Sequence, residues 1–212
     1  MKSTTKLIYN ELIIKYPALI ACKDEILQVF EIAKRTYLEG GKILVCGNGG
    51  SAADSEHIVG ELMKNFKKCR KADSELLSKL EDCEESKKLK EVLEGSLPAI
   101  SLTSHIALTT AYSNDKEPSA VFAQQLSGLG EKGDTFIAIS TSGNSLNCVY
   151  ACLVAKAKGL NTVAFTGAKD SRLSALSDVC VKVPETETYK IQEYHLPVYH
   201  ALCAMLEEEF FG

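Results

Sequence analysis

The chain has 212 residues, of which 45% are hydrophobic, and a formal net charge of -4 at pH 7. This length and hydrophobic content suffice for one domain with a full core over residues 1–212, and the acidic balance gives no electrostatic reason to expect a nucleic-acid partner. No apolar run approaches the ~20 residues of a membrane span, so we expect a cytoplasmic protein that does not enter a membrane.

The first 40 residues are predicted to be helical. Residues 5–18 and 22–39 carry apolar side chains at helical spacing, and Gly40-Gly41 ends the second helix. Amphipathic helices that precede a sheet often pack on a partner subunit, so this pair indicates an oligomer.

From residue 42 onward, short apolar runs alternate with helical patterns. The predicted buried strands are 42–46, 99–102, 135–140, 162–166 and 179–183. Helices are predicted over 51–66, 104–112, 118–128, 145–158, 171–176 and 188–210. This alternation predicts an α/β fold in which a five-stranded parallel sheet lies between two helical layers, because parallel neighbours require crossover connections. Ligands of such sheets bind at the carboxyl ends of the strands.

Residues 64–96 interrupt the alternation. The segment starts with a basic stretch at 64–71 and continues with a mixture of acids, lysines and leucines. Because runs of charge usually form solvated faces, we interpret it as a solvated helical insertion and not as a binding surface.

Two loops at predicted strand ends have the composition of anion-binding sites. In Gly47-Asn48-Gly49-Gly50-Ser51, closely spaced glycines let the backbone approach a ligand beside a helix N-terminus. In Ser140-Thr141-Ser142-Gly143-Asn144-Ser145, the hydroxyl groups provide neutral donors for a phosphate. Capping of the next helix would account for Ser145 alone. Together the two loops predict a phosphorylated ligand at the carboxyl edge of the sheet.

Several titratable side chains lie near these loops. His57 and Glu61 are one helical turn apart on the helix that leaves the glycine-rich loop, so they share one face. Such a pair is more often a surface contact, but its position behind the loop favours a functional role. The last helix begins with a cluster of Gln, Glu and His residues, in which we interpret His195 as structural; His105 is interpreted as local to its own helix.

These motifs resemble the sugar isomerase (SIS) domain, specifically its phosphoheptose isomerase branch, over residues 5–210. The matching segments are Gly47-Asn48-Gly49-Gly50-Ser51, His57-x3-Glu61, Asn114-Asp115, Ser140-Thr141-Ser142-Gly143-Asn144-Ser145 and Glu187-x4-Gln192-Glu193-x-His195-x4-His200. The resemblance implies the SIS fold, which is flavodoxin-like. It also implies interconversion of sedoheptulose 7-phosphate and D-glycero-D-manno-heptose 7-phosphate by homotetramers whose active sites lie at subunit interfaces.

The resemblance also assigns roles to individual residues. The residue matching Glu61 is the base and the residue matching His200 is the acid. A zinc ion can be held by the residues matching His57, Glu61, Gln192 and His200. The residues matching the family's substrate-binding positions are Asn48, Gly49, Gly50, Ser51, Asn114, Asp115, Ser140, Thr141, Ser142, Ser145 and Gln192.

The chain departs from the family at two places beside this site. An arginine that commonly follows the glutamate by four residues is replaced by Asn65, and the insertion at 64–96 is longer than in the best-known members. In addition, Gln192 and His200 would be about 12 Å apart along one straight helix. Either Pro197 distorts that helix or the two residues come from different subunits, and we expect the second, with each site built from at least two chains.

Two alternatives remain open from the sequence. One is a non-catalytic SIS module that binds a sugar phosphate or a replication initiator protein, which would not need Glu61, His57 and His200. Because all three are present, catalysis is favoured. The other is an isomerase of pentose or hexose phosphates, which shares the chemistry and differs in the length of its pocket.

Overall fold

Five parallel strands form the central sheet of the computed structural model, which describes residues 1–212. Their order is β2-β1-β3-β4-β5. The strands are β1 (Ile43–Gly47), β2 (Ala99–Ser101), β3 (Thr135–Ile139), β4 (Asn161–Thr166) and β5 (Val179–Lys182). The prediction of a five-stranded parallel sheet is confirmed, with each strand within one residue of its expected bounds.

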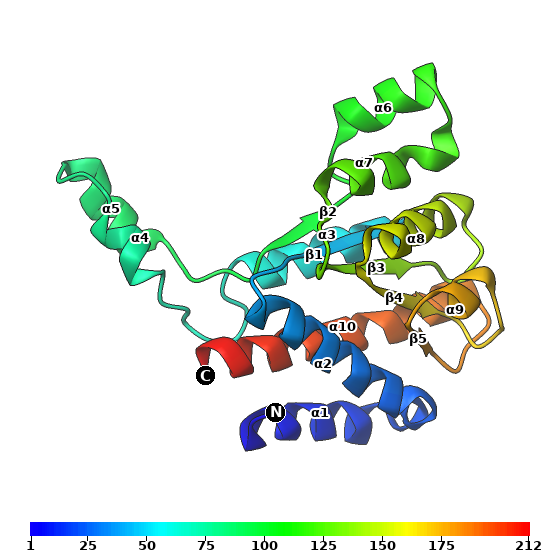
Figure 1. Cartoon of the computed structure of the whole chain (residues 1–212). Helices are drawn as coiled ribbons and strands as arrows, with labels where there is room; N and C mark the ends of the chain where they lie inside the picture. The colour runs from blue at the N-terminus through cyan, green and yellow to red at the C-terminus, as the bar shows by residue number, and fades with distance from the viewer.

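Helices cover both faces of the sheet (Figure 1). The α-helices are α1 (Ser3–Lys15), α2 (Lys23–Leu38), α3 (Gly50–Met63), α4 (Ser74–Ser78), α5 (Glu84–Val92), α6 (Ile106–Asp115), α7 (Val121–Leu129), α8 (Leu146–Lys158), α9 (Arg172–Leu176) and α10 (Thr188–Phe211). Short 3-10 turns occur at Pro17–Cys22 and Pro118–Ala120. Helices α2, α3 and α10 pack on one face, with α1 outside them along α10, and α7, α8 and α9 cover the other.

Strand β1 shows why the sheet has two cores. Its five residues are all buried, as expected for a parallel strand with helices on both sides. Ile43 and Val45 point into a cluster of 29 buried residues shared with α2, α3 and α10. Leu44 and Cys46 point into the opposite cluster of 16 buried residues. The alternation along the strand therefore anchors both helical layers and confirms the three-layer α/β/α arrangement.

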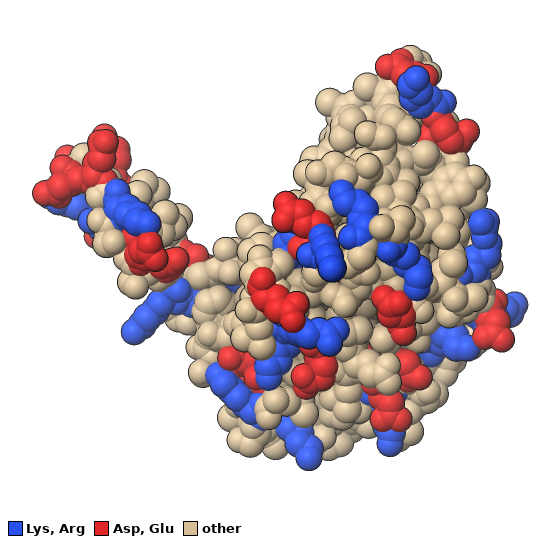
Figure 2. Space-filling model, in the orientation of Figure 1, with Lys and Arg blue, Asp and Glu red and all other residues tan.

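Helices α4 and α5 lie in an arm, residues 71–94, which projects away from the sheet (Figure 1). A backbone bridge between Lys71 and Glu94 closes its base, and Ser86 is its one buried residue. Figure 2 shows acidic and basic side chains crowded together on this arm. The prediction of a solvated helical insertion is confirmed for the arm but is wrong for Arg70 in the preceding basic stretch, because Arg70 is buried at 1% exposure beside Glu207.

Helix α6 lies outside α7, on the side away from the sheet (Figure 1). It has no buried side chain, and Ile106 at its start is 75% exposed. None of the helices combines the length and the apolar composition needed to cross a bilayer.

Candidate active site

The serine loop, residues 140–145, connects β3 to α8 at the carboxyl edge of the sheet. The Oγ atoms of Ser140 and Ser145 are 3.0 Å apart, and the backbone N–H of Asn144 donates to Ser142 Oγ at 3.2 Å. Ser145 occupies the N-cap position of α8 without a side-chain capping bond. Helix capping therefore does not account for its hydroxyl, which is free to join Ser140 in binding an anion.

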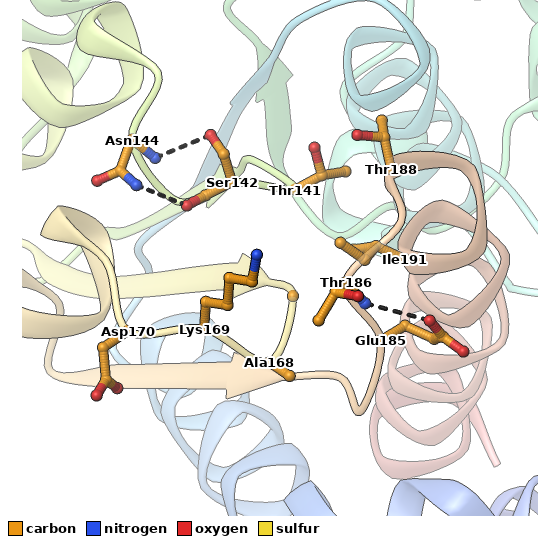
Figure 3. Close-up of a pocket in the computed structure, with 11 residues that line it drawn as sticks. Thr141, Ser142, Asn144, Ala168, Lys169, Asp170, Glu185, Thr186, Thr188 and Ile191 are labelled. Atoms are coloured by element: carbon orange, nitrogen blue, oxygen red, sulfur yellow. Dashed lines mark hydrogen bonds between the residues drawn. The ribbon is translucent and has the colours of Figure 1, made fainter.

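A polar cavity of about 210 Å³ opens beside the serine loop (Figure 3). We call it the serine-loop pocket. It is formed by the serine loop, the β4–α9 loop and the start of α10. Its lining residues are Thr141, Ser142, Asn144, Gly167, Ala168, Lys169, Asp170, Glu185, Thr186, Thr188 and Ile191. Of the predicted phosphate ligands, Thr141 and Ser142 line it directly.

Lys169 is a pocket residue that the sequence analysis missed. Its side chain extends from the β4–α9 loop toward Thr141 and Ser142 (Figure 3), and no carboxylate forms an ion pair with its amine. The neighbouring Asp170 is instead paired with Lys182 at 2.9 Å.

The second carboxylate that lines the pocket, Glu185, accepts the backbone N–H of Thr186 at 3.1 Å. The hydroxyl groups and the Lys169 amine are the donors that the pocket offers, and both kinds of donor suit a phosphate. The sequence signal that could have identified Lys169 was its position shortly after the fourth predicted strand, at the same edge of the sheet as the serine loop.

The glycine loop, residues 47–51, requires glycine at defined points. Gly49 has a φ of 57°, which is in the left-handed region. A Cβ on Gly47 would lie 2.4 Å from the backbone oxygen of Ser51, so no larger residue fits the turn. Asn48 and Asn147 exchange two amide hydrogen bonds of 3.0 and 2.8 Å. Because Asn147 follows the serine loop in α8, these bonds hold the two predicted loops side by side.

Gln192 lies against the glycine loop. A Cβ added to Gly50 would be 2.6 Å from Gln192 Nε2, so the amide of this α10 residue occupies the space that glycine leaves open. The predicted substrate-binding glycine and glutamine are therefore adjacent.

A second group of side chains, which we call the histidine cluster, joins α3 to α10 and comprises His57, Glu61, Tyr199 and His200. His57 Nε2 is 3.1 Å from Glu61 Oε1 and 3.4 Å from His200 Nε2. On its other side, His57 Nδ1 is 3.0 Å from the Tyr199 hydroxyl. The predicted base and the predicted acid thus both approach the same nitrogen, Nε2 of His57, which brings residues of α3 and α10 together.

Hydrogen bonding determines how His57 presents its nitrogens. The Tyr199 hydroxyl donates to Asp54 Oδ1 at 3.2 Å. Burial, reinforced by the Asp54 charge, raises the pKa of Tyr199, so the hydroxyl keeps its one proton. It therefore accepts a bond from His57 Nδ1, which leaves Nε2 as the nitrogen that faces Glu61 and His200.

The surroundings of His200 favour its neutral form. Burial, together with the nearby His57, lowers its pKa, and the Glu61 carboxylate only partly offsets this. The ring of Phe66 lies over it with centroids 5.6 Å apart. A neutral imidazole in this position is suited to exchange protons or to coordinate a cation.

The four predicted metal ligands are not all together in one chain. His57 touches Glu61 and His200, whereas Gln192 lies on the glycine loop, and no group of three His, Cys, Asp or Glu side chains is arranged around a metal position. Helix α10 runs from Thr188 to Phe211 with Pro197 inside it. The proline therefore does not break the helix, and Gln192 and His200 remain more than two turns apart.

The histidine cluster and the serine-loop pocket open to different spaces. His200 lines a cavity of about 420 Å³ between α1, Phe66 and the second half of α10, and no residue of the serine loop lines that cavity. Asn114 and Asp115 are elsewhere again, exposed at the end of α6, where Asn114 Nδ2 donates to Asp115 Oδ1 at 2.9 Å. A single chain therefore holds the predicted substrate-binding and catalytic residues at three separate places.

The remaining histidines have partners in the protein. His195 is fully buried, and its Nε2–H donates to the carbonyl of Thr166 at 3.4 Å. Burial lowers the pKa of His195 to about 4, so it is neutral in the fold, as a structural histidine should be. His105 is 2.6 Å from Gln125 of α7, so it connects two helices and is not local to its own.

Comparison with known proteins places these features in a family. The SIS domain family matches residues 19–95 and 91–167. The phosphoheptose isomerase of Thermodesulfovibrio yellowstonii is 40% identical over 186 residues, or 88% of this chain and 81% of that protein. The enzyme of that name from Aneurinibacillus thermoaerophilus is 38% identical over 196 residues, which cover 91% and 87% of the two chains.

Solved structures agree with the sequence comparison. The phosphoheptose isomerase from Francisella tularensis superposes with a TM-score of 0.76 and 29% identity, covering 98% of this chain and 100% of that one. The phosphoheptose isomerase from Neisseria gonorrhoeae gives a TM-score of 0.74 and 30% identity over 94% and 95% of the two chains. The chain therefore belongs to the phosphoheptose isomerase family of SIS domain proteins.

Proposed function

We propose that the protein interconverts sedoheptulose 7-phosphate and D-glycero-D-manno-heptose 7-phosphate. Its relatives of 38–40% identity bear the name phosphoheptose isomerase. The observation that carries the proposal is the contact of Glu61, His57 and His200 at the α3–α10 junction. A module that only bound a sugar phosphate would not need this cluster, so the non-catalytic alternative is not favoured.

The chemistry needs one base and one acid. A base removes a proton from C1 of the ketose, the electrons form an enediolate, and a proton returned to C2 leaves the aldehyde at C1. Glu61 is the proposed base, because its carboxylate lies 3.1 Å from His57 Nε2 and accepts a hydrogen bond from Lys64 Nζ at 3.4 Å. His200 is the proposed acid, which passes a proton between the two substrate oxygens or to the opposite carbon.

The serine-loop pocket is the proposed phosphate site. Thr141 and Ser142 line the pocket with their hydroxyls, Ser145 adds one from the end of the same loop, and Lys169 offers the charge complement that these neutral groups lack. A phosphate carries about two negative charges at pH 7, and charge-assisted hydrogen bonds are roughly twice as strong as neutral ones. Lys169 therefore contributes to affinity at a site where helix N-termini alone would provide only partial charge.

We propose that complete sites form between subunits of a homotetramer. Support comes from α6, which has no buried side chain and carries Asn114 and Asp115 away from its own pocket. To test this, inactive Glu61→Gln and Asp115→Ala proteins are unfolded together and refolded. Shared sites predict recovered activity, since some sites receive both intact residues. Complete sites within single chains predict none.

Zinc is the proposed cofactor of this site, with His57, Glu61, Gln192 and His200 as ligands. The donor set supports it: Tyr199 occupies Nδ1 of His57, which leaves Nε2 directed at the Glu61 carboxylate. Imidazole nitrogen and carboxylate oxygen are common zinc ligands. A bound zinc ion would polarise the substrate carbonyl. Elemental analysis of wild-type and His57→Gln protein tests the assignment, and equal zinc content in both would refute it.

The substrate assignment is tested by incubating the purified protein with sedoheptulose 7-phosphate and measuring the aldose product by NMR. Ribulose 5-phosphate and fructose 6-phosphate serve as shorter competitors. The proposal predicts conversion of the heptose with a higher kcat/KM than either competitor. A higher kcat/KM for a shorter sugar would support the isomerase reaction but show that the heptose is not the substrate. If none of the three sugars is converted, the proposed function is refuted. Because a phosphorylated sugar does not cross a bilayer unaided, this substrate class also favours a cytoplasmic enzyme.

A further inference from the structure

The basic stretch before the arm contains a buried ion pair that the proposed chemistry does not use. Arg70 Nε donates to Glu207 Oε1 at 2.8 Å, and the two side chains are 0% and 1% exposed. Burying two charges is costly, and an apolar pair of similar volume often stabilises a fold equally well. An apolar pair could not form the hydrogen bonds that Arg70 and Glu207 make to the surrounding backbone. Those bonds therefore indicate the role of the ion pair.

Glu207 holds the segment that leads into the arm. Its carboxylate accepts the backbone N–H groups of Phe66 and Lys67, both at 2.8 Å, and of Lys68 at 3.1 Å. Together with the Arg70 bond, both carboxylate oxygens are fully used. The backbone after α3 is thereby attached to the last turns of α10.

Arg70 holds the end of α3. Its two terminal nitrogens donate to the carbonyl of Leu62 at 2.6 Å and to the carbonyl of Glu61 at 2.8 Å. These carbonyls belong to the last turn of α3, where no N–H group of the helix itself reaches them, and the carbonyl of Leu62 also accepts the backbone N–H of Leu97 at 2.9 Å. The guanidinium thus satisfies the backbone of the residue that we assign as the base.

The Arg70–Glu207 pair is also linked to His200, the proposed acid. Glu207 follows His200 by seven residues in α10, so the two lie two turns apart on one face. Phe66, whose N–H is bound by Glu207, places its ring 5.6 Å from the His200 ring. The Arg70–Glu207 pair therefore connects the end of α3, the Phe66 backbone and the second half of α10 at one point beside Glu61 and His200.

We propose that Arg70 and Glu207 are positioning residues that set the placement of Glu61 relative to His200 and hold Phe66 over His200. This inference rests on the proposed function of the cluster. Neither residue touches the substrate, so the pair acts through the geometry of the cluster. Misplacement of a reacting group by about 1 Å costs on the order of 10²-fold in rate, and binding at the separate serine-loop pocket should be unaffected.

The test compares Glu207→Gln and Arg70→Lys with Lys34→Met. Lys34 pairs with Glu209 at 2.8 Å, so the control removes an ion pair from the same end of α10 without touching α3 or Phe66. We expect kcat for sedoheptulose 7-phosphate to fall by about 10²-fold in both pair variants with little change in KM, and to be retained in Lys34→Met. Melting curves establish that each protein is folded at the assay temperature. The proposal would be overturned if kcat fell in proportion to the loss of melting temperature in all three variants, Lys34→Met included.

A second readout does not depend on activity. The protein has only four histidines, so their ring protons can be followed individually by NMR. In Glu207→Gln the signals of His57 and His200 should shift, while those of His105 and His195 stay in place. If none of the histidine signals shifts in Glu207→Gln, the positioning role is overturned. Shifts confined to His57 and His200 would support that role. Both conclusions hold even if the wild-type enzyme acts on another sugar. If the single variants do not fold, the Arg70→Met/Glu207→Leu protein, which buries no charge, replaces them in both measurements.

Discussion

The serine-loop pocket and the histidine cluster are built in different ways. The pocket is formed by short polar side chains at the ends of β3 and β4, where neighbouring parallel strands bring consecutive loops to one edge. The histidine cluster depends on two long helices, α3 and α10, that are separated by over a hundred residues in the chain and pack together.

Because the two regions are built differently, they can serve different tasks. The pocket is placed by the sheet, the most regular part of the fold, and its groups suit recognition of a constant phosphate. The cluster is placed by helix packing and by the buried Arg70–Glu207 pair, so its geometry can be adjusted without changing the pocket. We therefore expect variants in the two regions to affect different kinetic constants.

The largest effect is expected from Glu61→Gln, which keeps shape but removes the basic carboxylate. If Glu61 is the base, kcat should fall by a factor on the order of 10² to 10⁴ with little change in KM, and His200→Asn should lose a similar factor. Steady-state kinetics with sedoheptulose 7-phosphate measure both constants. Glu56→Gln, an exposed change on the same helix, is the matched control. Wild-type turnover by Glu61→Gln would leave a binding module as the better description.

A smaller effect is expected in the pocket from Ser142→Ala, Ser145→Ala and Lys169→Ala. Each removes one proposed donor to the phosphate, so KM should rise by about ten- to a hundredfold, since hydrogen bonds to charged groups contribute roughly 1.5–3 kcal/mol. The fold should be intact because the side chains are on loops. Titration with inorganic phosphate measures the binding loss directly, with Ser78→Ala on the arm as control. Unchanged phosphate affinity in all three variants would show that the pocket is misassigned.

A third prediction concerns His195, which is buried between the two regions. Because its pKa is lowered to about 4, the unfolded chain takes up a proton first as the pH falls below 6.5. Stability from this residue is complete above pH 6.5, is lost between about pH 6.5 and pH 4, and changes no further below that. The loss should be about 3 kcal/mol.

Urea unfolding at a series of pH values tests this. Compared with wild type, His195→Leu should lose about 3 kcal/mol less between pH 7 and pH 4, whatever its absolute stability. Parallel pH curves for the two proteins would contradict a neutral buried imidazole.

The smallest effect is expected from the arm. Replacing residues 73–92 with a short Gly-Ser linker removes only one buried residue, Ser86, and leaves the Lys71–Glu94 bridge at its base. The melting temperature should change by less than about 4 °C, which corresponds to roughly 1 kcal/mol for a chain of this size. Both kcat and KM should be unchanged. Loss of activity or of the oligomer, measured by light scattering, would show that the arm has a partner.

The sequence predicted the part of the site that depends on local order. The five strands and the serine loop follow from apolar runs and from residue type, because strand ends in a parallel sheet meet at one edge. The same reasoning applied to the fourth strand would have included Lys169, which stands where a ligand of that edge is expected.

Other features were beyond local patterns. Arg70 lies in a run of lysines that reads as solvated, and its burial depends on Glu207, more than a hundred residues away. The separation of Gln192 from His200 was expected from helix geometry, but whether Pro197 would bend α10 depended on its packing. The contact between His57 and His200 was implied only by the family resemblance.

The central claim is that phosphate binding and proton transfer reside in separate regions. The most direct test is a cycle of Glu61→Gln, the Ser142→Ala/Ser145→Ala pair and the combined triple variant, measured as kcat/KM for sedoheptulose 7-phosphate. Independent regions predict that the loss in the triple variant equals the product of the two separate losses, within a factor of about two. A triple variant no worse than Glu61→Gln alone would show that the serine loop and the base act as one unit, and would contradict the account.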